Sequence, residues 1–417
     1  MANKQVDYKL FFTVFSLIIF GMIMISSVSV YSSYKVTSLM AKAGSITDAY
    51  NYFYVFRSII HVSISLFLLA IFVKVPYKYY EKHAKGLFVG SLALLIIVLV
   101  MGATWNGARG WIDLPFLPFA IQPTEFLKIT LIIYLAYFFK MNHKNITSFQ
   151  NSFMPFSAIV VFVVFLIALQ PDFGTILLLV PLSVIIFFSA GANVKYLGIL
   201  FVTGMLFATM IYHIGKYDTT HPESRNKLSY ITDRIDNFLS NSEDSIKNKT
   251  INYQTEQGLI AIGSGGFSGL GFGSSVQKFG YLPEVQGDFI FSVIIEELGF
   301  LGALVLISLY IFIGYRGFYI AFHSPDLFAR YVAIGITSRL LLQAFINMGV
   351  NLNVIPLTGV TLPFVSYGGS SLMSSVIGLA ILLNISRDID LTKSSRGIIF
   401  KGIFPKNRIF IRNHNQN

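Results

Sequence analysis

Cysteine is absent from the 417 residues, and Asp, Glu, Lys and Arg together make up only 12% of the chain. The lack of cysteine excludes disulfides and thiol chemistry. The seven histidines show no spacing such as H-E-x-x-H, so we expect no zinc site built by the protein. In contrast, 54% of the residues are hydrophobic, which is the balance of a membrane protein.

Apolar runs long enough to cross a bilayer, about 20 residues each, recur along the chain. The first run is too long for a signal peptide, and further spans follow it without a small-residue cleavage site, so we expect it in the mature chain. We predict an all-α membrane protein with about ten transmembrane helices in one polytopic domain, 1–417. The predicted spans are 10–32, 54–74, 86–103, 123–140, 152–170, 173–190, 196–215, 288–315, 328–350 and 359–385.

Lys and Arg gather in one set of alternate loops and in the basic tail, 387–417. Because cytoplasmic loops carry this excess, both termini are predicted to be cytoplasmic. The bias also explains the net charge of +11, so the tail indicates contact with membrane lipid and not with nucleic acid. The loops predicted outside the membrane are 33–53, 104–122, the turn around 171, 216–287 and 351–358.

The long extracytoplasmic loop, 216–287, separates spans seven and eight. Its part at 224–238 has apolar residues at helical spacing, which predicts an amphipathic helix on the outer surface. The glycine-dense part at 258–275 lacks the G-x-G-x-x-G spacing after a strand, so we expect no nucleotide site. We expect instead a close-packed loop of turns that a ligand or a neighbour can approach.

The eighth span opens with an acid. A helix starting near Asp288 would put Asp288, Ser292, Glu296 and Gly299 on one side and Glu297 on the opposite side. Carboxylates in a spanning segment are costly, about 2.5 kcal/mol or more at the centre, so they face protein or a wet cavity. Asp288 is therefore a candidate functional residue, the alternative being a simple cap of the helix N-terminus.

Other charged residues come from the same side of the membrane. Arg109 lies in GARGW, Glu125 and Lys128 lie one helical turn apart in QPTEFLK, and Asp172 lies in the QPDFG turn. Scattered loop charges are the alternative for each one alone. Lys128 is different, because a Lys inside a span needs a partner or a route to the interface.

The ninth span carries Arg339, Gln343 and Asn347 on one face, four residues apart. Counting the helical rise from the outer ends places Arg339 at the depth of Glu296 or Glu297. We therefore predict a buried, structural ion pair between Arg339 and one of these glutamates.

The segment 356–371, PLTGVTLPFVSYGGSS, contains prolines and a Gly-Gly pair that break helical structure near the start of the last span. Irregular backbone at membrane depth is tolerated only beside protein or a wet cavity. The segment is predicted to line the site, the alternative being an ordinary kinked helix start. Its candidate substrate-binding residues are Ser366, Tyr367 and Gly368.

These motifs resemble the SEDS family (shape, elongation, division and sporulation), which includes FtsW and RodA, with the FtsW type preferred. The resemblance runs from about residue 100 to 386. It implies a ten-span glycosyltransferase of the bacterial cytoplasmic membrane that polymerises lipid II into glycan strands at the outer face. It also implies a class B penicillin-binding protein as partner, within the divisome or elongasome. The matching segments are GARGW at 107–111, QPTEFLK at 122–128, QPDFG at 170–174, LPEVQGDFIFSVIIEELG at 282–299 and the segment 356–371.

By motif position, the essential carboxylate of the family falls on Asp288, which we assign as the base for the acceptor hydroxyl. Arg109 and Lys128 are candidate clamps for the lipid diphosphate. Glu125 and Asp172 could orient these cations or help to hold a divalent ion, Mg²⁺ or Mn²⁺, which the resemblance also suggests. We expect inversion at the sugar with a single base, and no nucleotide.

Two other classes of function remain open. Discontinuous helices and charged residues in the membrane are also typical of transporters, so a lipid II flippase is one alternative. A noncatalytic scaffold of the cell-wall synthesis complex is the other. The three readings differ in what happens when the Asp288 carboxylate is replaced.

Overall fold

The computed structural model describes residues 6–105, 108–113, 120–220, 232, 234, 236, 238 and 249–389. Its long helices are α1 (Tyr8–Val28), α2 (Val30–Lys42), α3 (Phe53–Phe72), α4 (Tyr77–Met101), α5 (Pro123–Met141), α6 (Met154–Ala168), α7 (Phe173–Ser189), α8 (Val194–Thr220), α10 (Lys249–Gly265), α11 (Ile290–Phe322), α12 (Leu327–Asn351) and α13 (Gly369–Ser386).

The prediction of an all-α, multi-pass membrane protein is confirmed. A helix occupies each predicted span, and seven helices in the described part are long and apolar enough to cross a bilayer. A small antiparallel hairpin of β1 (Ala103–Trp105) and β2 (Ala108–Trp111) was not predicted. The last span is shorter than predicted, because α13 begins only at Gly369, after the prolines and glycines of the preceding loop.

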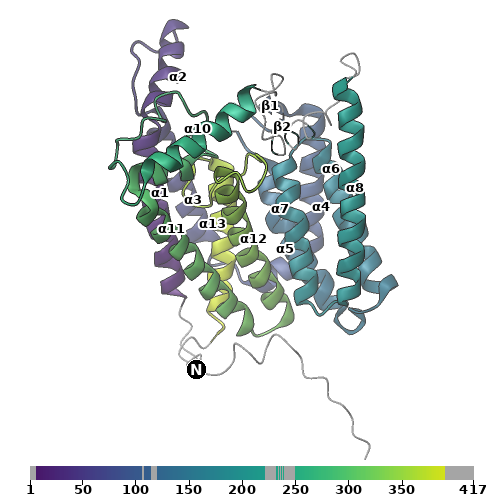
Figure 1. The fold of residues 1–417 in the computed structure, drawn as a ribbon. Helices are drawn as coiled ribbons and strands as arrows, with labels where there is room; N and C mark the ends of the chain where they lie inside the picture. Colours follow the sequence, from purple (N-terminus) through teal and green to yellow (C-terminus); the bar gives the residue numbers. More distant parts are fainter. Residues whose placement is uncertain are drawn as a thin grey trace, which may run out of the picture.

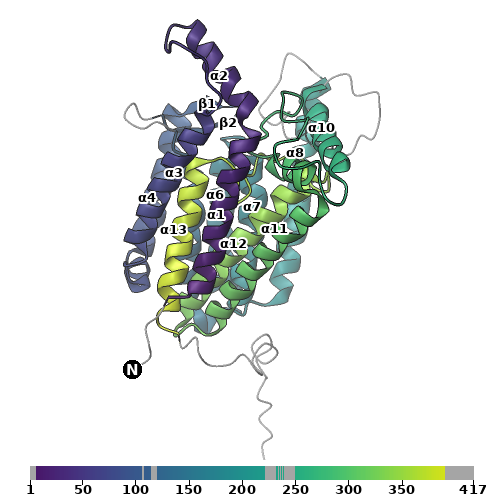
Figure 2. The same cartoon turned by 90° about the vertical axis from the view of Figure 1, so that its left-hand side faces the viewer.

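The helices form one bundle, and α2, α10 and the β1–β2 hairpin lie at the end opposite the N-terminus (Figure 1). A quarter turn shows α2 projecting from this end beyond the rest of the bundle (Figure 2). We call it the outer end. The loops predicted outside the membrane that the structure describes thus gather on one side. The predicted amphipathic helix at 224–238 lies largely outside the described residues, although the four described ones are helical.

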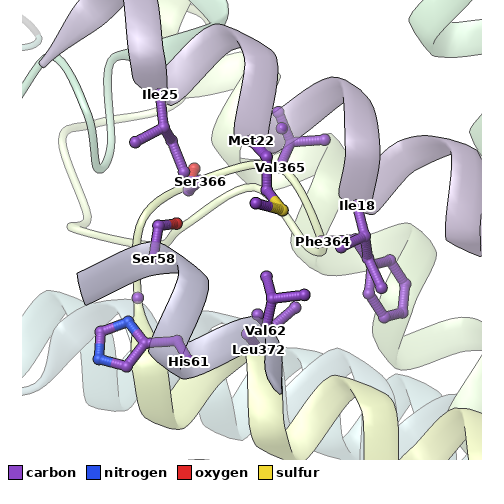
Figure 3. A pocket seen from close by; sticks show the side chains of 12 residues that line it. Ile18, Met22, Ile25, Ser58, His61, Val62, Phe364, Val365, Ser366 and Leu372 are labelled. Atoms are coloured by element: carbon purple, nitrogen blue, oxygen red, sulfur yellow. The ribbon is translucent and has the colours of Figure 1, made fainter. Parts of the chain in front are cut away.

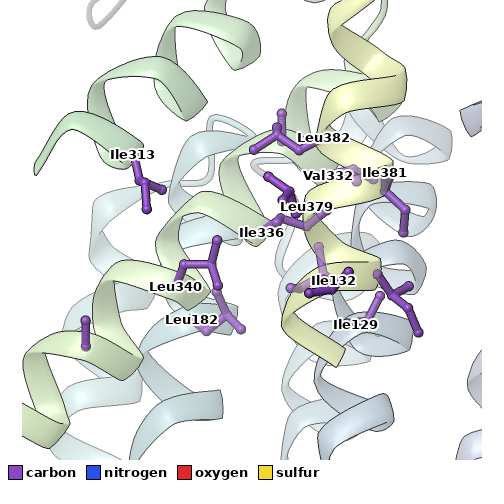
Figure 4. Close-up of a cluster of buried hydrophobic side chains, with 14 of the residues drawn as sticks. Ile129, Ile132, Leu182, Ile313, Val332, Ile336, Leu340, Leu379, Ile381 and Leu382 are labelled. Carbon is purple, nitrogen blue, oxygen red and sulfur yellow. The ribbon is translucent and has the colours of Figure 1, made fainter. Parts of the chain in front are cut away.

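The core is built around α12 and α13. Within the apolar windows of these helices, 78% and 89% of residues are buried, against 17% for α3 at the periphery. Branched aliphatic side chains from α5, α7, α11, α12 and α13 interlock between them (Figure 4). The apolar residues that remain exposed on peripheral helices are suited to contact with lipid, where no polar face is needed.

Helix α11 is broken at Gly299, whose φ of 68° and ψ of −169° are not helical. A break inside a membrane frees backbone groups that need partners. The segment that follows α10, residues 266–280, which we call the glycine-rich loop, supplies them: the Glu296 and Glu297 carbonyls accept from the backbone N–H of Leu270 and Gly271, both at 2.9 Å. On the other side of the break, Phe300 N–H and Leu301 N–H donate to carbonyls of the same loop.

This approach explains the glycines. A Cβ on Gly269 would lie 2.2 Å from the Glu297 carbonyl oxygen, and one on Gly265 would lie 2.0 Å from that of Ile295. Real Cβ atoms do not come this close, so only glycine lets the loop pair with the broken helix. The expected close-packed loop over 258–275 is confirmed only for 266–275, because 258–265 form the last turns of α10. The neighbour that approaches it is α11.

Candidate functional site

A row of polar side chains on α12 binds the backbone at Asp288 and the loop that precedes α13. The amides of Asn347 and Asn351 both donate to the backbone carbonyl of Asp288, at 2.9 and 2.8 Å. One turn deeper, Gln343 donates to the Thr361 carbonyl at 3.1 Å. The predicted shared face of α12 is confirmed, and Asn351 extends it by a further turn. This row holds two segments against one helix. They are residues 286–288, which we call the acid segment, and residues 352–368, the α12–α13 loop.

Asp288 lies just before α11, at the outer end, and is partly exposed. A Cβ built on Gly359 would lie 3.5 Å from its Oδ2 atom, so the carboxylate faces the α12–α13 loop. Burial, and then the charge of Glu284, raise the pKa of Asp288 to about 7, while the Arg234 guanidinium acts in the opposite direction. A carboxyl with this pKa can take up a proton near neutral pH.

The α12–α13 loop is tied to the residues that precede the acid. Ser366 Oγ donates to the Gly287 carbonyl at 2.7 Å, and Tyr367 N–H donates to the Gln286 carbonyl at 2.8 Å. Gly368 follows as the residue that caps α13. The three predicted substrate-binding residues of this loop therefore lie beside the acid segment, where two of them fix its backbone.

The far side of this loop faces α1 and α3 across a narrow cavity of about 10 Å³, room for about one water molecule (Figure 3). The Tyr367 ring packs edge-on against Tyr54, with centroids 5.0 Å apart, and lies 5.3 Å from the His61 ring. Ser366 and Gly368 line the cavity together with Ser58 and His61. The cavity is too small for a sugar, so in this conformation the loop simply packs against α1 and α3 here.

Deeper in the bundle lies a buried charge cluster. Lys128 Nζ lies 2.6 Å from Glu125 Oε1, and Arg339 Nη2 lies 3.4 Å from Glu125 Oε2. Ser374 joins the two, because its Oγ donates to Glu125 Oε2 at 2.9 Å and accepts from Arg339 Nη2 at 2.6 Å. Glu125 thus orients both cations, as predicted for Lys128.

The predicted pairing of Arg339 with Glu296 or Glu297 is wrong. Glu297 instead pairs with Lys278 Nζ at 2.9 Å, and Ser275 Oγ donates to Glu296. Both partners come from the glycine-rich loop, which folds back onto α11 through the break. Counting the helical rise along single spans could not reveal this loop.

The two remaining predicted residues come from the outer end. Asp172 caps α7, accepting from Thr175 N–H at 3.0 Å and from Thr175 Oγ1 at 2.7 Å, and it interacts electrostatically with Lys128. Gln122 Nε2 lies 3.4 Å from the same carboxylate. Arg109 is in strand β2, and its side chain lies outside the described part of the chain. Its predicted contact with a diphosphate stays a prediction.

A divalent ion does not fit the predicted pair of acids. Both oxygens of Glu125 are engaged by Lys128, Arg339 and Ser374, and Asp172 is engaged as a helix cap. Among the described residues, no three His, Asp or Glu side chains gather as metal ligands would. Eight residues of α12 separate Arg339 from Asn347, so the buried cluster lies roughly 12 Å below the level of Asp288.

Sequence patterns missed two groups near the acid. Arg234 lies between α8 and α10 in the sequence and donates from Nη1 to the Leu357 carbonyl at 2.7 Å. Glu284 adopts a positive φ of 51° in the turn before Asp288, and its carbonyl accepts from Gly287 N–H at 3.0 Å. Neither stands at a spacing that singles it out, since both depend on how the outer segments fold over the bundle.

The fold is that of a polytopic membrane protein with a carboxyl group at the outer end of its helix bundle. The family described as cell cycle protein, which comprises FtsW, RodA and SpoVE, matches residues 8–390, and the chain belongs to this family. It is 35% identical to stage V sporulation protein E of Bacillus subtilis over 395 residues, 93% of this chain and 99% of that relative. It is 34% identical to the probable peptidoglycan glycosyltransferase FtsW of Trichlorobacter lovleyi, covering 93% and 94% of the two chains.

Solved structures agree. One described as "Structural coordination of polymerization and crosslinking by a peptidoglycan synthase complex" contains a chain that matches with a TM-score of 0.69 at 26% identity, covering 92% of this chain and 98% of that one. The rod shape determining protein RodA of Thermus thermophilus matches with a TM-score of 0.61 at 25% identity, covering 92% and 97%. The resemblance to the SEDS family is confirmed.

Proposed function

We propose that this chain is a peptidoglycan glycosyltransferase that polymerises lipid II into glycan strands at the outer face of the bacterial cytoplasmic membrane. The observation that carries the proposal is the partly exposed Asp288 carboxyl at the outer end, where two amides of α12 hold its backbone and the α12–α13 loop lies against it. Relatives named as probable peptidoglycan glycosyltransferases support the same activity. An outer-interface site suits lipid II, which has its diphosphate at the interface and its polyprenyl tail in the bilayer.

Asp288 acts as the general base in this proposal. Its carboxylate takes the proton from the 4-hydroxyl of the acceptor sugar, and the freed oxygen forms a bond to the anomeric carbon of the donor. The bond from that carbon to the lipid diphosphate breaks, and the diphosphate leaves with the electron pair. Attack from the opposite face converts the α-linked diphosphate into a β-linkage, so a single base is sufficient.

Cations are needed where charge develops on the departing diphosphate. Arg109 remains the proposed bidentate clamp at the outer end. Lys128 has a side chain only 3% exposed and paired with Glu125, so its contact with a diphosphate requires the site to open and Glu125 to stay with Arg339. No step is assigned to a divalent ion. Polymer yield with and without a chelator tests whether Mg²⁺ or Mn²⁺ takes part.

Both termini are proposed to be cytoplasmic, which puts the outer end, with Asp288, outside the cell membrane. A class B penicillin-binding protein is the proposed partner, acting as transpeptidase within the divisome or elongasome. A likeness to a chain of a complex that combines polymerisation with crosslinking supports this partner. Reporter fusions at each terminus and after Lys42 of α2 test the orientation.

Purified protein in liposomes with labelled lipid II separates the candidate functions. A polymerase produces glycan strands from lipid II, and replacement Asp288→Asn abolishes them. A flippase moves lipid II between leaflets without making polymer. A scaffold gives neither result, and Asp288→Asn then still complements a deletion of the gene in cells.

A further inference from the structure

Arg234 and Asp288 meet at the same stretch of the α12–α13 loop, although 54 positions separate them in the sequence. Arg234 Nη1 donates to the Leu357 carbonyl at 2.7 Å. Two residues further on, Gly359 presents its Cα to the Asp288 carboxylate, with 3.5 Å from a Cβ built there to Oδ2. The guanidinium thus holds the loop two residues from the point at which the loop faces the acid.

A described residue close to Arg234 in the sequence has a partner on the helix bundle. Two residues after Arg234, Asp236 accepts a hydrogen bond from the hydroxyl of Tyr212 on α8 at 2.6 Å. Arg234 is half-buried between this anchor and the loop. A guanidinium with a fixed base and a backbone acceptor has little freedom, so its charge stays near the acid.

The described surroundings of the Asp288 carboxylate contain few other charges. Glu284, in the same turn, acts as a like charge, and Arg234 as the opposite charge. From α12, Asn347 and Asn351 contribute neutral amides, and they bind the Asp288 carbonyl and not its carboxylate. The α12–α13 loop contributes backbone. Of the described groups that act on the carboxylate, Arg234 is therefore the one that favours its ionised form.

We propose that Arg234 is a positioning residue of the Asp288 site, which holds the α12–α13 loop against the acid and sets a fixed positive charge beside the carboxylate. The inference rests on the proposed glycosyltransferase function and adds to it a residue from the long extracytoplasmic segment. The charge keeps the base in its proton-accepting form despite burial and Glu284. The tether holds Gly359 at the distance that leaves the carboxylate access to an acceptor hydroxyl.

The test is the pH dependence of lipid II polymerisation by the full chain in lipid nanodiscs, for the wild type, Arg234→Gln and Arg234→Lys. Lys42→Gln, which removes an exposed cation from α2 at the same end, is the matched control. Removing the guanidinium charge is expected to move the acidic limb of the profile upward by roughly one pH unit. At pH 7 this lowers the ionised fraction, and the rate, about five-fold. Arg234→Lys and Lys42→Gln are expected to keep the midpoint.

An Arg234→Gln profile with the wild-type midpoint overturns the inference while leaving the proposed function intact. A wild-type protein that makes no polymer at any pH removes both. Thermal melting of each variant reports on folding. If Arg234→Gln melts well below the wild type, Arg234→Lys decides, because it keeps the charge but loses the fork that binds Leu357. A wild-type midpoint with a reduced rate then supports the inference, and a shifted midpoint overturns it.

Discussion

The buried charge cluster predicts which of its variants is the less stable, because removing the single anion and removing one of the two cations leave different net charges behind. Glu125 is one anion between two cations, Lys128 at 2.6 Å and Arg339 at 3.4 Å, whose side chains are 3% and 0% exposed. Glu125→Gln leaves both cations buried without their anion. Breaking a buried pair in this way costs about 3–5 kcal/mol.

Arg339→Met is the milder change, although it removes a fully buried charged residue. It leaves Glu125 and Lys128 as a neutral pair and removes the hydrogen bond to Ser374 Oγ at 2.6 Å. Ser374 still donates to Glu125. The expected loss is about 1–3 kcal/mol, the usual cost of a buried hydrogen-bond partner, so the two variants differ by about 2 kcal/mol.

Thermal unfolding of the purified protein in detergent checks this order. Glu125→Gln is expected to melt a few degrees below Arg339→Met, since about 1 kcal/mol corresponds to roughly 2–4 °C in domains of 150–250 residues and to less in larger ones. Glu256→Gln on the exposed side of α10 is the matched control and is expected to melt like the wild type. If Arg339→Met proves as damaging as Glu125→Gln, the reasoning from charge balance is refuted.

Two further outcomes follow from the structure. Gly269 and Gly273 both have a φ of +81°, but of these two only Gly269 has neighbours within 4 Å of a Cβ built on it, the nearest being the Glu297 carbonyl oxygen at 2.2 Å. The Gly269→Ala variant is therefore expected to melt several degrees lower than Gly273→Ala. Equal melting temperatures would contradict the pairing of the glycine-rich loop with α11. Because the pKa of Asp288 is raised to about 7, its carboxylate becomes protonated as the pH falls through neutrality. The rate of polymerisation is therefore expected to rise between pH 6 and pH 8 and then to level off. A rate that does not change over this range argues against Asp288 as the base.

The spans and the shared face of α12 could be predicted because each depends on spacing along one helix. Apolar runs have to cover a bilayer, and polar residues four apart have to face the same way. Asn347 and Gln343 accordingly bind the predicted loop before α13. The partners of the buried charges could not be predicted from the spacing of residues along one helix. Which helix or loop faces Arg339 or Glu297 is decided by tertiary packing.

For the glycine-rich loop, the sequence predicted the close backbone approach but not the partner. Its composition indicated a close approach of backbone, which the contacts of Gly265 and Gly269 confirm. That the approaching neighbour is a break in α11 at Gly299 could not be predicted, because the break depends on the loop that pairs with it. Arg234 was missed for a similar reason, since its place beside Asp288 depends on the fold of a long outer segment.

The central claim is that the Asp288 carboxylate is the base of a glycan polymerisation. The most direct measurement is the initial rate of polymer formation from labelled lipid II by the wild type, by Asp288→Asn and by the exposed control Asp48→Asn, in the same liposomes at pH 7.5. Loss of a general base is expected to lower the rate about 10²–10⁴-fold in Asp288→Asn while Asp48→Asn keeps the wild-type rate. Polymer formation by Asp288→Asn at a rate close to that of the wild type would contradict the account.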